Sequence, residues 1–310
     1  MQRILSRGEI EGLDHTLIPR VRLPQLASVY AERAARFHHL SIGSPLQGYL
    51  TLMAHLSEGQ QLALAGCGDV PGASESRLSL AQSHGMPPLQ AVGWQRDPLW
   101  RDMLQHILKH MMGVADIPAQ ARAVCDALNK RLTERPDNIE QLADALLARL
   151  DDVDGASAPF VMAGLQTYWT ALAGRFELDQ LPVVSPFGVC PLCGSLPVSS
   201  IVRVGGQADA CRYLSCSLCA SEWHLVRVTC SHCEHTEKVA YHSIEGGSEA
   251  IRAESCDDCG SYRKIFYQHK DAHVDAVADD LASLALDIMM GEEGYSQPSD
   301  NPLLWQKKEG

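Results

Sequence analysis

The chain has 310 residues, 45% of them hydrophobic, and a formal net charge of −12. This length is sufficient for two domains with a substantial buried core. The acidic balance argues against a nucleic-acid partner, because binding to phosphates needs a basic face that displaces counterions, and the absence of an apolar stretch of about 18 residues predicts no membrane insertion.

The N-terminal stretch MQRILSRGEIEGLDHT carries a charge or a glycine every few residues. It has no apolar run of the kind that a secretory signal requires. We therefore expect a cytoplasmic protein. Thiols stay reduced in that compartment, so closely spaced cysteines there more often bind metals or carry out redox chemistry than form structural disulfides.

Apolar residues recur at helical spacing from about Leu23 to Gly174. We interpret each apolar stripe as the core face of a helix in a bundle. His106 and His110 lie four residues apart in this part, but no third metal ligand is in view, so we interpret them as a surface or half-buried pair. The expected helices follow Pro24, Pro45, Pro98 and Pro118, and two more lie around 142–150 and 160–172.

The pattern changes at LDQLPVVSPFGVCPLCG, where two prolines and a glycine before the first cysteine interrupt the helical spacing. We place a domain boundary near Pro182. Beyond it, the alternation in SSIVRV and EWHLVRV predicts short strands, and Gly205 with Gly206 predicts a tight turn.

The cysteine-rich part contains an internal repeat. Four CxxC pairs occur in it, and the first and third pairs, like the second and fourth, are separated by 40 residues (230 − 190 = 40 and 256 − 216 = 40). Each repeat unit must be complete in itself, so the repeat also assigns the pairs to two sites. The predicted sites are Cys190, Cys193, Cys216 and Cys219 for the first, and Cys230, Cys233, Cys256 and Cys259 for the second.

Two facing CxxC turns present four sulfurs tetrahedrally, which suits one zinc or one iron ion. The spacing fits both metals, and a bridged iron–sulfur cluster ranks third. A site closed by four cysteines leaves no position for substrate, so we expect no metal-centred catalysis and no catalytic residues. The alternative is a thiol–disulfide or sulfur-transfer protein that uses one CxxC pair. We interpret His232 and His235, beside the third pair, as solvent-facing, and expect Gly194 and Gly260 to adopt positive φ.

After the second site, an apolar stripe from Val274 to Met289 predicts a C-terminal helix, with Asp279, Asp280 and Asp287 off the stripe. Beyond this helix, Leu303, Leu304 and Trp305 follow a Pro/Ser/Asp segment. We favour their docking on the chain itself over contact with a partner.

The cysteine repeat behind a helical domain resembles the formate dehydrogenase accessory protein family, FdhE. The resemblance covers nearly the whole length. All eight cysteines of the family pattern are present. The segments that carry the resemblance are SPFGVCPLCGSLPVSS, RYLSCSLCASEWHLVRVTCSHC, SCDDCGSYRKIFYQHKD and DAVADDLASLALDIMMGEEGYSQPSDNPLL.

The resemblance implies two tandem rubredoxin-like lobes, iron in both sites, and a non-catalytic role in making formate dehydrogenase active by binding its catalytic subunit in the cytoplasm. The expected class is α+β, with an all-α N-terminal domain, two rubredoxin-like (zinc-ribbon-like) lobes and a C-terminal helix. The expected boundaries are 1–182 for the helical domain, 183–228 and 229–270 for the lobes, and 271–310 for the C-terminal helix and tail.

Overall fold

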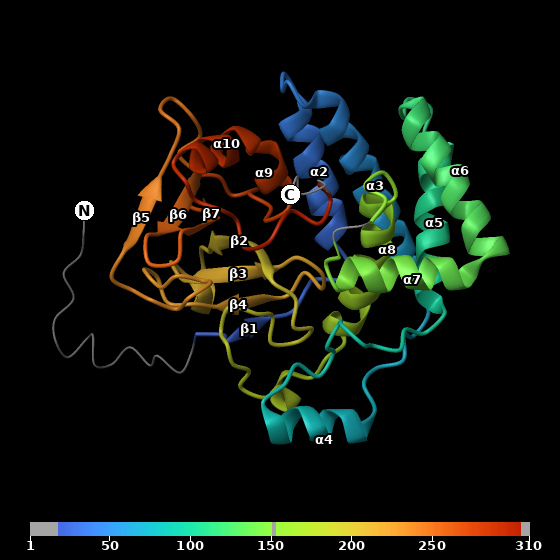
Figure 1. The fold of residues 1–310 in the computed structure, drawn as a ribbon, viewed down its shortest axis with the longest axis horizontal. Coiled ribbons are helices and arrows are strands. Elements are labelled where there is room, and N and C mark those ends of the chain that lie inside the picture. Colours follow the sequence, from blue (N-terminus) through green and yellow to red (C-terminus); the bar gives the residue numbers. More distant parts are fainter. Residues whose placement is uncertain (1–17, 151–152, 305–310) are drawn as a thin grey trace.

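The computed structural model describes residues 18–150 and 153–304. A helical layer occupies one side of the molecule and a mixed sheet the other, and two short C-terminal helices lie over the sheet (Figure 1). The α+β class and the order of its parts are as predicted. The stretch on which the expectation about a secretory signal depends, residues 1–16, lies outside the described residues.

The helical layer is built from amphipathic segments of the predicted kind. In α5, the apolar positions from Trp100 to Met111 recur every three or four residues and all face the core. Pro136 occupies the first turn of α7, where a missing N–H group costs nothing. The helices are α2 (Val29–Ser41), α3 (Gln47–Gly66), α4 (Glu75–His84), α5 (Leu99–Gly113), α6 (Ala119–Glu134), α7 (Pro136–Leu147) and α8 (Ala158–Gly174).

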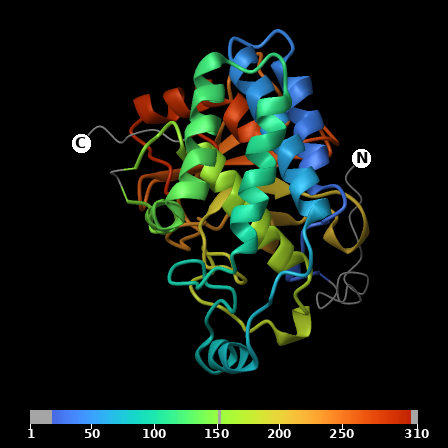
Figure 2. The same cartoon turned by 90° about the vertical axis from the view of Figure 1, so that its right-hand side faces the viewer.

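Helix α4 was not predicted, and it lies apart from the bundle (Figure 2). Ala81 is its one buried residue, so the helix has no apolar stripe that a sequence pattern reveals. Helix α8 is the opposite case, because Ala158 to Ala173 are all buried. A helix buried on every side is expected at the centre of a fold, and α8 lies between the bundle and the sheet.

The described residues form one seven-stranded sheet with the order β1-β4-β3-β2-β7-β6-β5. Neighbouring strands are antiparallel except β2 and β7, whose parallel pairing joins the two repeat units into a single sheet. The strands are β1 (Val21–Arg22), β2 (Pro197–Val202), β3 (Arg212–Cys216), β4 (Glu222–His224), β5 (Val239–His242), β6 (Ile251–Cys256) and β7 (Ser261–Tyr267).

The two ends of this sheet differ. The N-terminal segment adds β1 to β4, so the outer edge of the first repeat is covered. No strand among the described residues pairs with the outer side of β5, which is an open edge. Lobe 1, here meaning residues 190–224, is therefore flanked on both sides, whereas lobe 2, meaning residues 230–267, is flanked on one.

The C-terminal prediction needs a correction. The chain forms two short helices, α9 (Ala278–Ala282) and α10 (Leu284–Glu292), in place of one long helix. Asp279 and Asp280, predicted off the apolar stripe, are 0% and 2% exposed. Their burial depends on cations from distant segments, because Arg36 of α2 forms two hydrogen bonds with Asp279, at 2.9 and 2.6 Å, and Lys264 of β7 lies 3.1 Å from Asp280.

The tail docks on the chain itself, as favoured from the sequence. Leu303 is fully buried, and Tyr49 of α3 donates a hydrogen bond to its carbonyl group. Leu304 packs partly buried against the main core. Trp305, part of the same prediction, lies outside the described residues.

Candidate metal centres

The eight predicted cysteines lie in four tight turns at one end of each repeat. Cys190 and Cys193 precede β2, while Cys216 ends β3 and Cys219 lies in the turn to β4. The second repeat uses the same positions: one pair precedes β5, and the other spans the end of β6 and the turn to β7. Antiparallel pairing of each hairpin then places one turn against the other.

The structure brings the sulfurs together in two groups of four. In the first, which we call centre 1, Sγ of Cys190 lies 3.6 Å from Sγ of Cys219, and Sγ of Cys193 lies 3.4 Å from Sγ of Cys216. In the second, centre 2, the matching distances are 3.7 Å for Cys230 to Cys259 and 3.6 Å for Cys233 to Cys256. Within each group all four sulfurs lie within 4.8 Å of one another.

These separations fit a metal ion. Four sulfurs held about 2.3 Å from a central ion at tetrahedral corners are roughly 3.8 Å apart, whereas a disulfide needs about 2.05 Å. All eight cysteines are free thiols in the structure. Each group therefore has the donor set and spacing for one tetrahedral ion, zinc or iron.

Backbone conformation explains the curl of each turn. The residue after the second cysteine of every pair has positive φ, at 75° for Gly194, 55° for Ala220, 64° for Glu234 and 64° for Gly260. The prediction for the two glycines is confirmed, and the same conformation extends to an alanine and a glutamate. The curl points backbone N–H groups at sulfur, for example from Cys219 to Sγ of Cys216 at 3.4 Å.

Centre 1 is enclosed by the helical layer. Its four cysteines are 0–3% exposed and belong to the main hydrophobic core. The segment after α4 hydrogen-bonds to the first turn, from Leu89 N to Leu192 O at 2.8 Å and from Ala91 N to Cys193 O at 2.9 Å. Gln166 of α8 donates to the carbonyl group of Ser217 in the second turn, at 2.8 Å.

Burial raises the pKa of the Cys190 and Cys216 thiols well above the ordinary value. Four thiolates in such a site repel one another and have lost their hydration, so they need a bound dication for compensation. A metal ion bound by all four sulfurs would compensate the negative charge of the thiolates. In this setting the ion would hold the two turns of lobe 1 together.

Centre 2 is more open. Cys230 and Cys256 are buried, whereas Cys233 and Cys259 are half-buried. Burial by itself would raise the pKa of Cys230, but hydrogen bonds from the backbone N–H groups of Cys233 and His232 outweigh it and lower the pKa to about 7. His232 and His235 are exposed and belong to neither group of sulfurs, which agrees with their predicted solvent-facing positions.

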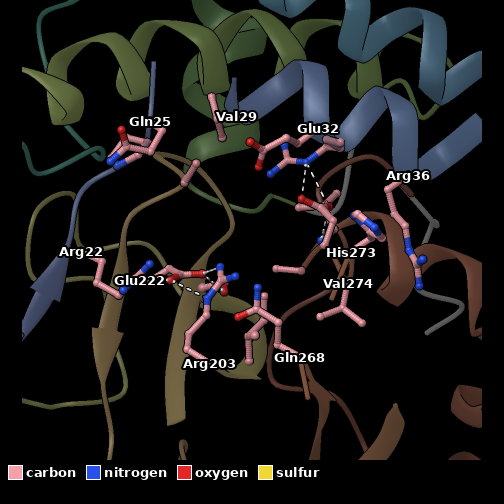
Figure 3. A pocket seen from close by; sticks show the side chains of 18 of the residues that line it. Arg22, Gln25, Val29, Glu32, Arg36, Arg203, Glu222, Gln268, His273 and Val274 are labelled. Atoms are coloured by element: carbon pink, nitrogen blue, oxygen red, sulfur yellow. Dashed lines mark hydrogen bonds and ion pairs between the residues drawn. The ribbon is translucent and has the colours of Figure 1, made fainter. Parts of the chain in front are cut away.

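A cleft of about 1070 Å³ adjoins centre 1, and Cys216 is one of its lining residues. Helix α2 forms one wall, and the sheet with the segment before α9 forms the other (Figure 3). Two guanidinium groups, of Arg22 and Arg203, contact the single carboxylate of Glu222 on the sheet side. Glu32 lines the helix side and is exposed.

A third group of possible metal ligands was missed from the sequence. It contains His38, His55 and Glu58, and His110 lies beside it. His106 and His110 are exposed and half-buried, as interpreted from the sequence, and His106 contacts the backbone carbonyl of Asp102. The sequence offered one local signal for this group, the H-x-x-E spacing of His55 and Glu58 on α3. The other histidines come from different helices, so no spacing along the chain relates them to this pair.

No helix in the described part of the chain is long and apolar enough to cross a membrane.

Comparison with known proteins gives a consistent result along the chain. The family model described as "FdhE, N-terminal" matches residues 18–185, "FdhE, central domain" matches 189–227, and "FdhE, C-terminal domain" matches 228–304. Both groups of four cysteines fall within the central and C-terminal matches.

Whole-length relatives agree with these matches. A protein named "Protein FdhE homolog" from Yersinia pestis (strain Pestoides F) is 41% identical over 310 residues, covering 97% of this chain and 96% of that protein. The homologue from Yersinia enterocolitica serotype O:8 has the same identity and coverage. The crystal structure of the FdhE protein from Pseudomonas aeruginosa is 37% identical, with a TM-score of 0.81, and the match covers 92% of this chain and 98% of that one.

Proposed function

Because the chain belongs to the FdhE family, we propose that it is a non-catalytic accessory factor for formate dehydrogenase, which binds the catalytic subunit of that enzyme in the cytoplasm. The observation that carries this proposal is the pair of closed four-cysteine centres within a whole-length match to the family. Four protein ligands leave the ion in each centre no open position for a substrate. Such centres suit a role in shaping a protein surface or exchanging electrons.

The cleft beside centre 1 is the surface that we expect to contact the catalytic subunit. It lies where the helical layer meets the sheet, so both halves of the chain contribute to it. Its lining carries four arginines and four carboxylates, together with apolar side chains from β1 and α2. A protein segment with charges of both signs is complementary to such a surface, whereas a polyanion is not.

The binding experiment uses the purified chain as bait for the catalytic subunit. We expect capture by the unaltered chain and at least tenfold weaker capture by Glu32→Lys, which reverses an exposed charge on the cleft wall. The matched control is Glu75→Lys on α4, outside the cleft lining, which should bind as the unaltered chain does. Capture no better than that of an unrelated protein of equal charge would reject the accessory role, and equal loss in both variants would reject the cleft as the contact.

We propose iron as the metal in both centres, with zinc as the alternative. Metal analysis and the visible spectrum of protein purified without oxygen distinguish them. Close to two irons per chain, with sulfur-to-iron charge-transfer bands and no acid-labile sulfide, is the expected result. Two zinc ions and no colour would leave the centres as rigid structural elements and remove any electron-transfer role.

The thiol-exchange alternative has one supporting observation, the lowered pKa of Cys230 beside two half-buried sulfurs in centre 2. It requires a fast-reacting thiol in the metal-loaded protein, because the thiolate is the attacking species. Counting alkylatable cysteines in the native holoprotein tests it. Fewer than two thiols among the eight that react as fast as they do in the metal-free protein would exclude it.

A further inference from the structure

Three histidines surround one carboxylate on the helical layer, remote in sequence from the cysteine centres. His38 comes from α2, His55 and Glu58 from α3, and His110 from α5. Nε2 of His38 lies 2.8 Å from Oε1 of Glu58, and Nδ1 of His55 lies 2.9 Å from Oε2. Nε2 of His110 approaches the same Oε2 at 3.6 Å.

Helix packing produces this convergence. His55 and Glu58 are three residues apart and therefore share one face of α3. Helix α3 packs against α2 on one side and α5 on the other, so the face receives a histidine from each neighbour (Figures 1 and 2).

Gly59 provides the room for His110. A Cβ atom at this position would lie 3.2 Å from Cδ2 of the His110 ring and 3.4 Å from the Ile107 side chain. Glycine is unfavourable inside a helix relative to alanine, yet here it lies in the interior of the 20-residue helix α3. Its position lets the imidazole of α5 approach the surface of α3 closely.

The spacing of the ligand atoms suits a metal ion. Nitrogen and oxygen ligands about 2.0–2.1 Å from a tetrahedral ion are roughly 3.3 Å apart. One ligand atom from each of His38, His55 and Glu58 lies within 4.8 Å of the other two, and His110 approaches the glutamate at 3.6 Å. The side chains are 22–42% exposed, so an ion can enter from solvent.

Hydrogen bonding alone accounts for only part of the arrangement. His38 and His55 each have a hydrogen-bond partner in Glu58. Nε2 of His110, in contrast, is buried and makes no hydrogen bond in the structure. A buried polar atom without a partner is unfavourable, and coordination of an ion shared with Glu58 would satisfy it.

We propose that His38, His55 and Glu58 form a third metal site, which binds a divalent first-row ion such as Zn²⁺ through nitrogen and oxygen, and that His110, which lies beside them, becomes the fourth ligand when the ion binds. Three imidazoles and a carboxylate prefer such an ion to Mg²⁺ or Ca²⁺, which favour oxygen ligands. The ion would join α2, α3 and α5. This site is independent of the function proposed above and of the metal in the cysteine centres.

The test is a Zn²⁺ titration of the full-length holoprotein with both cysteine centres already filled, followed by calorimetry and by metal analysis after dialysis. We expect one further Zn²⁺ per chain. His55→Ala and Glu58→Gln should each weaken this binding at least 100-fold. His39→Ala, next to His38 but exposed, and His106→Ala, one turn before His110 and exposed, are the matched controls and should bind as the unaltered chain does.

Co²⁺ provides a second readout that separates the sites by donor atom. Its spectrum at the third site should lack the intense sulfur-to-cobalt bands that the cysteine centres give. Circular dichroism in metal-free buffer checks that each variant is folded. Absence of a third equivalent, or a third equivalent that survives both His55→Ala and Glu58→Gln, would overturn the proposal.

Discussion

Centre 1 and centre 2 have the same four-cysteine pattern in different surroundings. All four cysteines of centre 1 are at most 3% exposed, and they lie in the main core with α8 and the segment after α4. Centre 2 has two half-buried cysteines and lies beside β5, which is an edge strand of the sheet formed by the described residues. Sequence repetition therefore specifies the ligands, whereas position in the sheet determines how far each centre is exposed to solvent and reagents.

The surroundings also suggest different consequences of losing the ion. Lobe 2 contributes Ala250 and Phe266 to the main core. Two more of its buried apolar residues, Ala253 and Tyr262, form a small separate cluster with Leu286 and Met290 of α10. A cluster of this size contributes far less hydrophobic stabilisation than the main core. We expect loss of centre 2 to loosen lobe 2 alone, and loss of centre 1 to affect the whole molecule.

The largest expected effect comes from removing one ligand at equivalent positions of the repeat. Cys193→Ser should lower the free energy of unfolding by about 4 kcal/mol or more, because it leaves buried thiols uncompensated in the core. Cys233→Ser should cost about half as much. Urea unfolding followed by tryptophan fluorescence measures the first effect, since Trp94, Trp100, Trp169 and Trp223 all lie in the main core.

The destabilisation caused by Cys233→Ser is measured by the hydrogen exchange of backbone amides in β5 and β6. Their exchange should become faster in this variant while the amides of α8 stay protected. Equal shifts of the tryptophan transition in the two variants would contradict the distinction between the centres. Cys193→Ser could fail to give soluble protein while Cys233→Ser succeeds. This difference in yield would equally show that centre 1 contributes more to stability than centre 2.

Next in size is the ion pair that links the lobes across the sheet. Arg212 of β3 passes Ser200 of β2 and reaches Glu254 of β6 at 2.8 Å, and both side chains are at most 3% exposed. Glu254→Gln should destabilise the protein by about 3 kcal/mol, because it leaves a buried guanidinium without its counter-charge. Glu237→Gln, an exposed neighbour in lobe 2, is the control in thermal and urea unfolding. A loss below about 1 kcal/mol would mean that the lobes are not coupled through this pair.

The rate of cysteine alkylation by iodoacetamide compares the solvent access of the two centres in the unaltered protein. In the native holoprotein, we expect Cys233 and Cys259 to be alkylated at least ten times faster than Cys190 and Cys193. A tenfold ratio corresponds to about 1.4 kcal/mol in the opening that exposes the sulfur. Peptide mass spectrometry over a time course gives the individual rates. Equal rates at the two centres would show that the difference in burial does not control access.

The smallest effect concerns the left-handed residue after the second cysteine, which is Gly194 in lobe 1 and Glu234 in lobe 2. Gly194→Ala should cost about 1 kcal/mol, because alanine at φ 75° is strained and its Cβ atom would meet the Gln90 side chain. Glu234→Gly relieves similar strain but loses the hydrogen bond that Phe187 N donates to the glutamate at 2.8 Å. Its net change in the urea midpoint should be near zero.

Local patterns predicted much of the fold. The apolar stripe of α5 and the proline that opens it indicated that helix, because the signal lies within one segment. Helix α4 buries a single residue and gave no such signal. The C-terminal stripe indicated helix but misplaced Asp279 and Asp280, because a stripe describes only the apolar face. The cations that stabilise these two carboxylates come from α2 and β7.

The sequence by itself determined the two cysteine groups. The CxxC spacing is a local property of the chain, and the offset of 40 residues assigns each pair to its partner without reference to the fold. Only the tertiary structure decided that β2 joins β7 and that β1 covers β4, while β5 has no outer neighbour within residues 18–150 and 153–304. It also decided that three helices bring His38, Glu58 and His110 together. These contacts join residues whose separation in sequence follows no fixed period, so they depend on how the finished elements pack.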